Sequence, residues 1–465
     1  MLDVTAGMGG ENKMKTPSRI ERDTMGEVLV PGEALYGAET QRAVENFPIS
    51  RLRFTRPFIR ALGIIKAAAA KANGELGVLP LDLAAAIETA AQQLAQGDYD
   101  AQFVVDIFQT GSGTSTNMNA NEVIARIPGA HFKDHVNLSQ SSNDVIPTAI
   151  HVAAAELVHH ELLPAMARLH STLREKAEEF DDVPKIGRTH LQDAVPIRLG
   201  QEFSGYARQV ELSIDRVRKA IDGLYELALG GTAVGTGLNV PPGFATAAIQ
   251  VLAEQTKLPF REAQNHFEAQ ASKDAMCFLS GALKSYAVSL TKIANDIRWL
   301  GSGPRCGLGE LRLLAVQPGS SIMPGKVNPV IAESVLMACA QVIGHDATMT
   351  WACASGNFEL NVMMPVIAYD LLESIELLGA STKNFEKRCI ASLQVDRERA
   401  SAFVEQSLAM GTALVPEIGY DLAATLVKEA YESGRTIREV AREKSGIPAD
   451  RLARLLDPLR QTGPA

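Results

Sequence analysis

Long stretches in which apolar residues recur every three or four positions constrain the fold of this 465-residue chain more than any other feature. Such spacing lines one face of an α-helix with apolar side chains. The pattern fills residues 148–180, 201–229 and 268–300, while Pro329 and Pro365 stand where two further helices begin, as proline often does in a first helical turn. At 1.5 Å per residue, a helix over 268–300 spans roughly 50 Å.

Several helices of this length present more apolar surface than one compact chain can bury. We therefore expect an elongated helical bundle whose surplus apolar faces pack against copies of the same chain. The alternative is a monomeric bundle. Pro164 is expected to kink the helix over 148–180. The alanine-rich segment 61–73 predicts a helix that neighbours can approach closely, and strand signals are confined to 26–31 and 193–198.

The same patterns predict three domains. They are a mixed but mostly helical N-terminal domain over 1–147, a central long-helix bundle over 148–394 and a small helical C-terminal domain over 395–465. Within the last, glycines separate shorter predicted helices around 400–410, 420–433 and 437–444. The chain before about residue 18 is expected to be a frayed tail.

Composition argues against several classes of protein. The 45 basic and 54 acidic side chains give a net charge of −9, which disfavours a surface that binds nucleic acid. The five cysteines form no CxxC pair, so we expect a reduced, cytoplasmic chain without a disulfide framework or a zinc site. No uninterrupted apolar run approaches the roughly 18 residues of a transmembrane helix, and no apolar segment near residue 1 resembles a secretory signal.

Four short polar segments interrupt this apolar, helical background. The most distinctive, residues 319–328, combines two hydroxyls, one lysine and one amide, and its glycines and proline predict a loop. A polar loop that is hinged by glycine and carries Lys326 suits a lid that closes over an anion. The alternative is an ordinary surface turn, because Ser, Gly and Pro are the usual turn residues.

Residues 109–119 and 136–144 carry mainly neutral hydrogen-bonding side chains. The first segment holds five hydroxyls and two asparagines among glycines, and it runs into a helix start near Asn121, where anions are attracted. The second directly precedes the long helix, which we expect to start near Pro147. A flexible linker and a helix N-cap are the alternatives, but one cap needs only one such side chain.

The remaining segment, residues 185–193, contains His190, the only side chain in the four segments that is a candidate general acid or base with an ordinary pKa near neutrality. A single histidine is more often structural. Glu333 lies five residues after Asn328, early on the next helix, where a buried carboxylate would hold an imidazole and raise its basicity. The glycine-rich stretch 230–237 follows a helix and lacks the lysine of a phosphate loop, so we interpret it as a sharp turn.

None of these segments carries a metal-binding or nucleotide-binding motif. Many neutral donors, one or two cations and a histidine–carboxylate candidate fit a small polycarboxylate substrate. Removal of a proton next to a carboxylate, with electrostatic stabilisation of the resulting aci-carboxylate, corresponds to β-elimination or to the reverse addition across a C=C bond.

Taken together, the four segments resemble the aspartase/fumarase superfamily, and within it the class II fumarate hydratases. The 319–328 loop looks like the superfamily signature GSSxMPxKxN. Further similarity to the class II family lies at residues 22–26, 109–119, 139–144, 185–193, 230–239, 302–310 and 354–362. The resemblance implies three mostly helical domains, a homotetramer with a core of about 20 long helices, active sites shared by three subunits, and no metal or organic cofactor.

The resemblance also implies a role for each site residue. Ser320 takes the C3 proton of (S)-malate while its loop closes over the substrate, and His190, paired with Glu333, handles the water that leaves or adds at C2. The two substrate carboxylates are bound by Ser112, Thr114, Ser141, Ser142, Asn143, Thr189, Lys326 and Asn328. The implied reaction is the reversible hydration of fumarate to (S)-malate in the tricarboxylic acid cycle.

Other members of the superfamily are alternatives. Aspartate ammonia-lyases share the signature loop, but they commonly carry glutamine where this chain has His190, and they lack the ASGNFELNV sequence of 354–362. Argininosuccinate and adenylosuccinate lyases resemble the chain mainly in the loop. A non-catalytic protein that kept the fold would have no physical need for this set of side chains.

One segment departs from the family pattern. Many fumarases have a second dicarboxylate site with an arginine three residues before a His-Pro-Asn-Asp run. Here the run starts at His131 and reads His-Phe-Lys-Asp, and residue 128 is proline. The family's contacts are therefore not carried over, although Arg126 and Lys133 offer charge for an anion.

Overall fold

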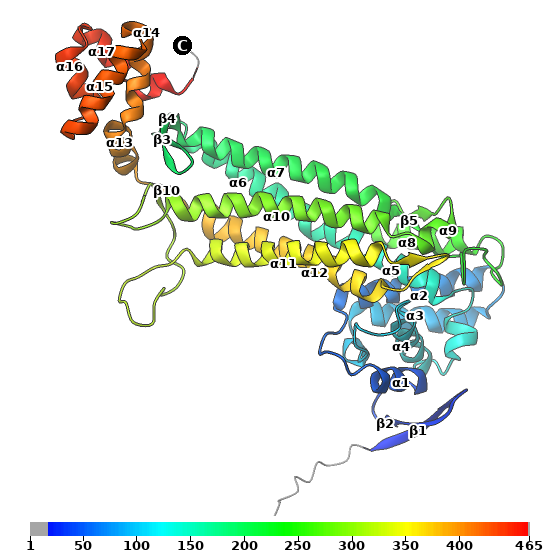
Figure 1. Ribbon diagram of the computed structural model, residues 1–465. Helices are drawn as coiled ribbons and strands as arrows, with labels where there is room; N and C mark the ends of the chain where they lie inside the picture. The colour runs from blue at the N-terminus through cyan, green and yellow to red at the C-terminus, as the bar shows by residue number, and fades with distance from the viewer. Residues whose placement is uncertain (1–16, 464–465) are drawn as a thin grey trace, which may run out of the picture. The chain divides into compact units, whose positions relative to one another are not determined.

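The computed structural model describes residues 17–463, which form seventeen α-helices and ten short strands (Figure 1). The mainly α fold predicted from the sequence is confirmed. Within the same residues the strands pair only two by two, and every pair except β5–β6 is antiparallel. The strands therefore form local hairpins and clips, and helix packing supplies the core.

The chain divides into two compact units. Unit 1 comprises the described part of 1–156 together with 223–276 and 349–372, and unit 2 comprises 157–222, 277–348 and the described part of 373–465. The three predicted domains follow chain order rather than this division, and they stay a prediction.

Unit 1 begins with a hairpin and is built mainly from helices. Its strands are β1 (Ser18–Asp23), β2 (Gly26–Pro31), β5 (Glu226–Leu227), β6 (Arg261–Glu262), β8 (Gly356–Asn357) and β9 (Leu360–Asn361). Its helices are α1 (Ala38–Asn46), α2 (Arg56–Glu75), α3 (Leu81–Gln96), α4 (Thr114–Arg126), α5 (Ser142–Leu157), α8 (Phe244–Thr256) and α9 (His266–Ala271).

Helix α2, which confirms the helix predicted over 61–73, is mostly buried because it packs against α3, α4 and α8. Its small side chains let α3 approach closely. A Cβ atom at Gly63 would lie 2.7 Å from the backbone nitrogen of Ala95 and 2.8 Å from the carbonyl oxygen of Ala91. Only glycine fits at this contact without a shift of one helix backbone.

Unit 2 holds most of the long helices. They are α6 (Leu163–Glu179), α7 (Leu199–Ile221), α10 (Asp274–Leu300), α11 (Val330–Cys353) and α12 (Met364–Phe385), and parts of the last three belong to unit 1. The hairpin β3 (Pro184–Thr189) and β4 (Gln192–Arg198) joins α6 to α7, and β7 (Leu311–Arg312) pairs with β10 (Gln394–Val395).

The C-terminal part of unit 2 has a hydrophobic cluster of its own, drawn from residues between Val404 and Leu456. Its helices are α13 (Arg397–Gln406), α14 (Val415–Ile418), α15 (Tyr420–Ser433), α16 (Ile437–Lys444) and α17 (Ala449–Leu455). The short helices predicted for this region are confirmed, with α17 in addition.

Buried polar contacts fix how α10, α11 and α12 pack along one another (Figure 1). The hydroxyls of Tyr286 on α10 and Thr382 on α12 are 2.8 Å apart, and Nδ1 of His345 on α11 lies 3.0 Å from Oγ of Ser374 on α12. Since these groups are buried among apolar side chains, a shift of register would leave polar atoms unpaired.

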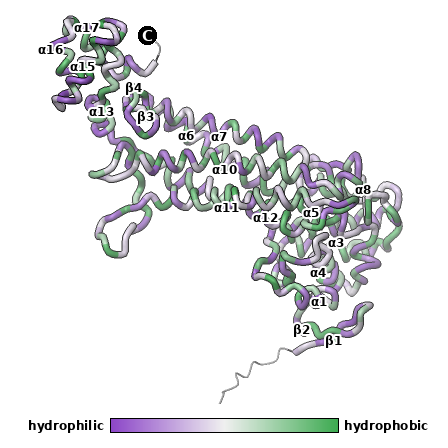
Figure 2. Tube along the Cα trace, viewed as in Figure 1, coloured by the Kyte–Doolittle hydropathy of each residue, from purple (hydrophilic) through white to green (hydrophobic). Residues whose placement is uncertain are grey.

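Helix α11 is rich in apolar residues (Figure 2), but it is poorly buried. It is the one helix among residues 17–463 that is long and apolar enough to cross a membrane, although core helices of soluble proteins meet the same criteria. Only 33% of its most apolar window is buried, and Met337 and Trp351 are 69% and 79% exposed. We expected no such segment because Glu333 and Asp346 interrupt its apolar run. The helix leaves an apolar face uncovered within a single chain.

The predicted start of the long helix near Pro147 is wrong. Helix α5 begins at Ser142, and Pro147 lies inside it. The helix predicted over 148–180 is interrupted by a π-helical segment, Val158–Leu162, next to Pro164. Proline has no N–H to donate within a helix, which accounts for an irregularity at the predicted position.

The helix predicted over 268–300 is split into α9 and α10. Ser272 has an extended backbone, and the buried ammonium of Lys273 donates to the carbonyl oxygens of Gln270 (2.6 Å) and Ser272 (2.8 Å). A side chain thus satisfies carbonyls at the end of α9 that would otherwise lack a partner. The helix predicted over 201–229 also ends early, at Ile221.

The predicted strands over 26–31 and 193–198 are confirmed as β2 and β4, with β4 starting at Gln192. Their partners β1 and β3 are not predicted by the sequence. The tail expected before about residue 18 falls mainly on residues 1–16, which lie outside the described residues, and Ser18 already begins β1.

The close contact at Gly63 predicts the effect of a single methyl group. Gly63→Ala should lower the thermal unfolding midpoint, because overpacking typically costs about 1–3 kcal/mol. Gly205→Ala in α7 is the matched control, since an added Cβ there meets nothing within 4 Å. Calorimetry of both variants checks this, and an unchanged midpoint for Gly63→Ala would contradict the close packing of α2 and α3.

Candidate active site

The loop between β7 and α11 folds back on itself through its polar groups. The backbone N–H of Gly319 donates to the carbonyl of Lys326 (2.8 Å), and the Asn328 amide donates to the carbonyl of Gly319. The loop encloses a concavity of about 600 Å³ lined by residues 315–318 and 320–327. The predicted lid is thus an exposed loop whose two ends are held together.

Ser320 lies at the start of this loop with two donors on its hydroxyl oxygen. The backbone N–H groups of Ile322 (3.2 Å) and Met323 (2.9 Å) both donate to Ser320 Oγ. Serine turns make the same kind of contact, but two N–H groups aimed at one oxygen also stabilise that oxygen when it is deprotonated. Lys326 is exposed, and no hydrogen bond or ion pair of its side chain to another described residue is present.

His190 occupies the tip of the β3–β4 hairpin. His190 and Leu191 connect the strands as a two-residue turn, with φ values of 56° and 60°. Positive φ at both central positions is usual for tight hairpins, but glycine or asparagine normally supplies it, so a histidine and a leucine here carry backbone strain. Thr189, His190 and Leu191 are all exposed. The hairpin therefore presents the imidazole and the Thr189 hydroxyl outward.

Glu333 lies in the first turn of α11 and is partly exposed. No contact between Glu333 and His190 is present within the described chain, so their pairing stays a prediction. A carboxylate in the first turn is stabilised in its ionised form by the helix dipole.

Ser112 and Thr114 lie in unit 1, where α4 begins. Their hydroxyls are 2.8 Å apart, and Gly113 between them has a φ of 73°. A Cβ at Gly113 would crowd the Ile146 side chain at 2.9–3.0 Å. The glycine therefore lets the α4 N-terminus approach the start of α5 closely.

Ser141, Ser142 and Asn143 lie at and just before the first turn of α5. Ser142 Oγ accepts a hydrogen bond from the Asn117 amide of α4 (3.0 Å), which joins the two polar segments of unit 1. Ser141 Oγ accepts the N–H of Asn143 (3.2 Å), and the Asn143 amide donates to the carbonyl of Ala233 (2.8 Å). Unit 1 thus brings together the five predicted substrate-binding residues that it contains.

A buried charged pair behind these residues is not predicted by the sequence. Nζ of Lys66, on α2, donates to Asn137 Oδ1 (3.0 Å) and Gln140 Oε1 (2.9 Å). Asp144 accepts the N–H groups of Ser141 (2.9 Å), Gly230 (3.0 Å) and Thr232 (2.9 Å). A lysine within an alanine-rich helix is the available signal, but Lys71 on the same helix is partly exposed, and the sequence does not distinguish it from Lys66.

Burial shifts the pKa of both Asp144 and Lys66. It raises the pKa of Asp144 to about 6 and lowers the pKa of Lys66 to about 7, while the charge of each partner opposes the shift of the other. Through Asp144 the glycine-rich turn at 230–237 is tied to the segment that carries Ser141. The chain turns sharply at 230–237 so that the N–H groups of Gly230 and Thr232 reach the same carboxylate oxygen.

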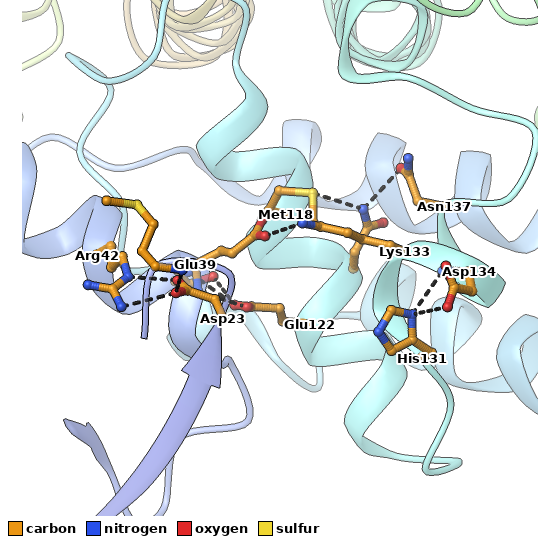
Figure 3. A network of polar contacts seen from close by, with 12 residues as sticks. Asp23, Glu39, Arg42, Met118, Glu122, His131, Lys133, Asp134 and Asn137 are labelled. Carbon is orange, nitrogen blue, oxygen red and sulfur yellow. Dashed lines mark hydrogen bonds and ion pairs between the residues drawn. The ribbon is translucent and has the colours of Figure 1, made fainter. Parts of the chain in front are cut away.

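The segment around His131 forms a separate polar network (Figure 3). Arg126 pairs with Glu21 at 3.0 Å, and Lys133 pairs with Glu39. The His131 ring accepts the N–H of Asp134 at 3.0 Å. Both cations that could attract a second dicarboxylate thus already have acidic partners. Within residues 17–463 no group of three or more His, Cys, Asp or Glu side chains is placed to hold a metal ion.

Comparisons with known proteins decide the family. The chain matches a family model described as Lyase over residues 26–344 and one described as Fumarase C C-terminus over 411–463. A fumarate hydratase class II from Mycobacterium tuberculosis is 54% identical over 94% of this chain and 93% of its own length. The chain belongs to the class II fumarate hydratase family. A relative of the same name from Xylella fastidiosa is 51% identical over 96% of this chain and 95% of its own.

The fold agrees with this family. The crystal structure of a recombinant class II fumarase from Schistosoma mansoni matches with a TM-score of 0.92 at 40% identity, and the match covers 96% of this chain and 99% of that chain. Membership of the class II fumarate hydratase family makes the protein a lyase, and the predicted resemblance is confirmed. The roles of individual residues stay predictions.

The buried lysine gives a prediction for stability against pH. Because burial lowers the pKa of Lys66 to about 7, the unfolded chain binds more protons than the folded chain above that pH. The unfolding free energy should therefore rise between pH 7 and about 10, by up to about 1 kcal/mol per pH unit. Thermal unfolding at pH 7, 8 and 9 measures this rise.

Lys66→Met should flatten the rise, because methionine has no proton to release. Lys71→Met, on the same helix but partly exposed, is the control and should keep the slope of the unaltered protein. Equal slopes for all three proteins would show that Lys66 is not the titrating group.

Proposed function

We propose that the protein catalyses the reversible hydration of fumarate to (S)-malate in the tricarboxylic acid cycle. Family membership supports the reaction, and the observation that carries the mechanism is the pair of N–H donors on Ser320 Oγ. A serine hydroxyl is a weak base in water. Donors already aimed at the oxygen, with Lys326 in the same loop, are the groups that would stabilise its alkoxide.

In the proposed dehydration, the Ser320 alkoxide takes the C3 proton of (S)-malate. The electron pair of the broken C–H bond moves into the adjacent carboxylate and gives an aci-carboxylate. That pair then returns to form the C=C bond while the C2–O bond breaks, and the leaving hydroxide accepts a proton from His190 and departs as water. Hydration follows the same steps in reverse, with His190 as the base that activates water.

The remaining roles follow from charge and donor type. Glu333 would orient the imidazole of His190 and stabilise it when protonated. The hydroxyls and amides of Ser112, Thr114, Ser141, Ser142, Asn143, Thr189 and Asn328, together with the Lys326 ammonium, would bind the two carboxylates. Neutral donors suit this task, since the substrate already carries two negative charges and the chain carries a net −9.

We also propose that the protein is a homotetramer whose active sites each combine segments from three subunits. The poorly buried apolar face of α11 supports assembly through the long helices, where about 20 helices would form the shared core. The exposed hairpin tip and the exposed lid support shared sites, because each presents reactive groups outward. The five cysteines of the sequence form no CxxC pair, which supports a cytoplasmic location.

Aspartate ammonia-lyase is the second candidate, because it would use the same loop to remove a proton next to a carboxylate. His190 favours fumarate hydration, since loss of water needs an acid at C2 whereas an ammonium group leaves without one. The two reactions yield the same product from different substrates, so one assay separates them.

We predict that the purified protein produces the ultraviolet absorbance of fumarate from (S)-malate and not from L-aspartate. Ser320→Ala should lower kcat by several orders of magnitude and leave the assembly unchanged in gel filtration, because it removes only one partly exposed hydroxyl in a loop. A signal from aspartate alone would replace hydration by ammonia loss. Unaltered turnover by Ser320→Ala would exclude it as the base.

Shared sites predict complementation between inactive variants. Ser320→Ala and Asn143→Ala alter different units, so some mixed assemblies would contain sites with both residues intact. Partial activity should therefore return after the two variants are mixed under conditions that exchange subunits. Each variant taken through the same exchange alone is the control, and no recovery in exchanged mixtures would contradict shared sites.

A further inference from the structure

An ion pair two residues from His190 joins segments that are far apart in the sequence. Arg188 Nη1 lies 2.7 Å from Glu310 Oε2, and Arg188 Nη2 lies 3.2 Å from Glu310 Oε1. The Glu310 side chain is fully buried and that of Arg188 is 15% exposed. The contact is therefore a desolvated, bidentate pair, the arrangement that most restricts the orientation of a guanidinium group.

Each partner is adjacent to a segment of the proposed active site. Arg188 lies on β3 immediately before Thr189 and His190. Glu310 directly precedes β7, after which the chain runs into the lid that carries Ser320. The pair therefore ties the hairpin, close to its tip, to the root of the lid within unit 2.

The backbone of Glu310 is held by the segment of chain that directly precedes α13. The N–H of Asp396 donates to the Glu310 carbonyl (2.9 Å), and β7 pairs with β10 directly before Asp396. Helix α13 packs against β3, and the Phe403 ring on α13 lies 5.7 Å from the Arg188 guanidinium. The salt bridge is thus enclosed by strand pairing on one side and an aromatic ring on another.

Stability alone does not account for such a pair. A buried ion pair gains little over two apolar side chains of similar volume, because desolvation offsets the attraction between the charges. Apolar side chains cannot fix the orientation of the segments that they join, whereas a bidentate ion pair can. The adjacent His190–Leu191 turn has positive φ at both residues, and such turns persist only where surrounding contacts over-determine them.

We propose that Arg188 and Glu310 are positioning residues that fix the His190 turn and the root of the lid in the orientation that fumarate hydration needs. This proposal rests on the proposed function. Arg188 acts through His190, and Glu310 acts through the lid root. Five of the eight residues proposed to bind the carboxylates lie on other elements, in unit 1, whereas Thr189, Lys326 and Asn328 lie on the hairpin and the lid. Loss of the pair should therefore affect turnover more than substrate affinity.

The decisive comparison is between the single variant Arg188→Met and the double variant Arg188→Met/Glu310→Met. Arg188→Met leaves the buried Glu310 carboxylate without its cation, so both the unfolding midpoint and kcat should fall. Arg188→Met/Glu310→Met removes both charges and should restore the midpoint. The kcat of the double variant should stay about 10²-fold low, because small misplacements of catalytic groups cost about that much, with KM changed less than threefold.

Arg312→Met is the matched control. Arg312, which lies two residues after Glu310 in the chain, forms a 2.6 Å ion pair with Asp396. The Arg312 side chain is 67% exposed. Its loss should leave kcat unchanged. If kcat of the double variant recovers together with its unfolding midpoint, Arg188 and Glu310 have only a structural role and the proposal is overturned.

Hydrogen exchange supplies a readout that does not depend on turnover. In the double variant, amides at 184–198 and 311–328 should exchange faster than in the unaltered protein, while those of α6 and α7 should not. Unchanged exchange at the hairpin and lid would overturn the positioning role even if kcat fell. If the unaltered protein did not act on malate, the proposed function would fail, and the exchange data would still test the coupling of hairpin and lid.

Discussion

The need to bury the apolar faces of α10, α11 and α12 governs the arrangement of everything else in this protein. Hydrophobic burial drives the association of these helices, and buried polar pairs such as Tyr286–Thr382 specify the register. The segments predicted to carry the chemistry lie where helices start or where loops and a hairpin join them. The predicted lid ends at Pro329, directly before α11, and Ser142 opens α5.

The two units prepare their polar groups in opposite ways. In unit 1 the hydroxyls proposed to bind substrate are held by a buried network that runs from Lys66 through Asn137 to Asn117 and Ser142. Neutral donors fixed in this way would need little reorganisation when a dianion arrives. In unit 2 Ser320 and His190 lie on exposed loops. In the proposed mechanism, binding would therefore fall mainly to buried, fixed groups and proton transfer to groups on exposed loops.

Much of the fold was accessible from the sequence because periodicity and proline are local signals. Helix α11 follows directly from Pro329 and the apolar spacing after it, and α12 from Pro365. The start of α5 was misplaced because Pro147, a common first-turn residue, tolerates a position further inside the helix. Strand β3 was missed because Lys185 and Arg188 are charged, and the acidic partners beside which they lie, Glu202 and Glu310, belong to other elements. The 319–328 loop was recognisable because its residues are contiguous in the sequence. The three N–H groups that donate to Asp144 come from Ser141 and from Gly230 and Thr232, in two loops that lie far from each other in the sequence.

The exposed apolar face of α11 also affects the protein before it assembles. The single chain carries a helix with the length and composition of a membrane segment, of which only 33% of the most apolar window is buried. In the proposed tetramer, assembly is a collision between subunits, so the time that this face stays uncovered would lengthen as the subunit becomes scarcer. Slow synthesis would therefore leave each subunit open to aggregation for longer than rapid synthesis does.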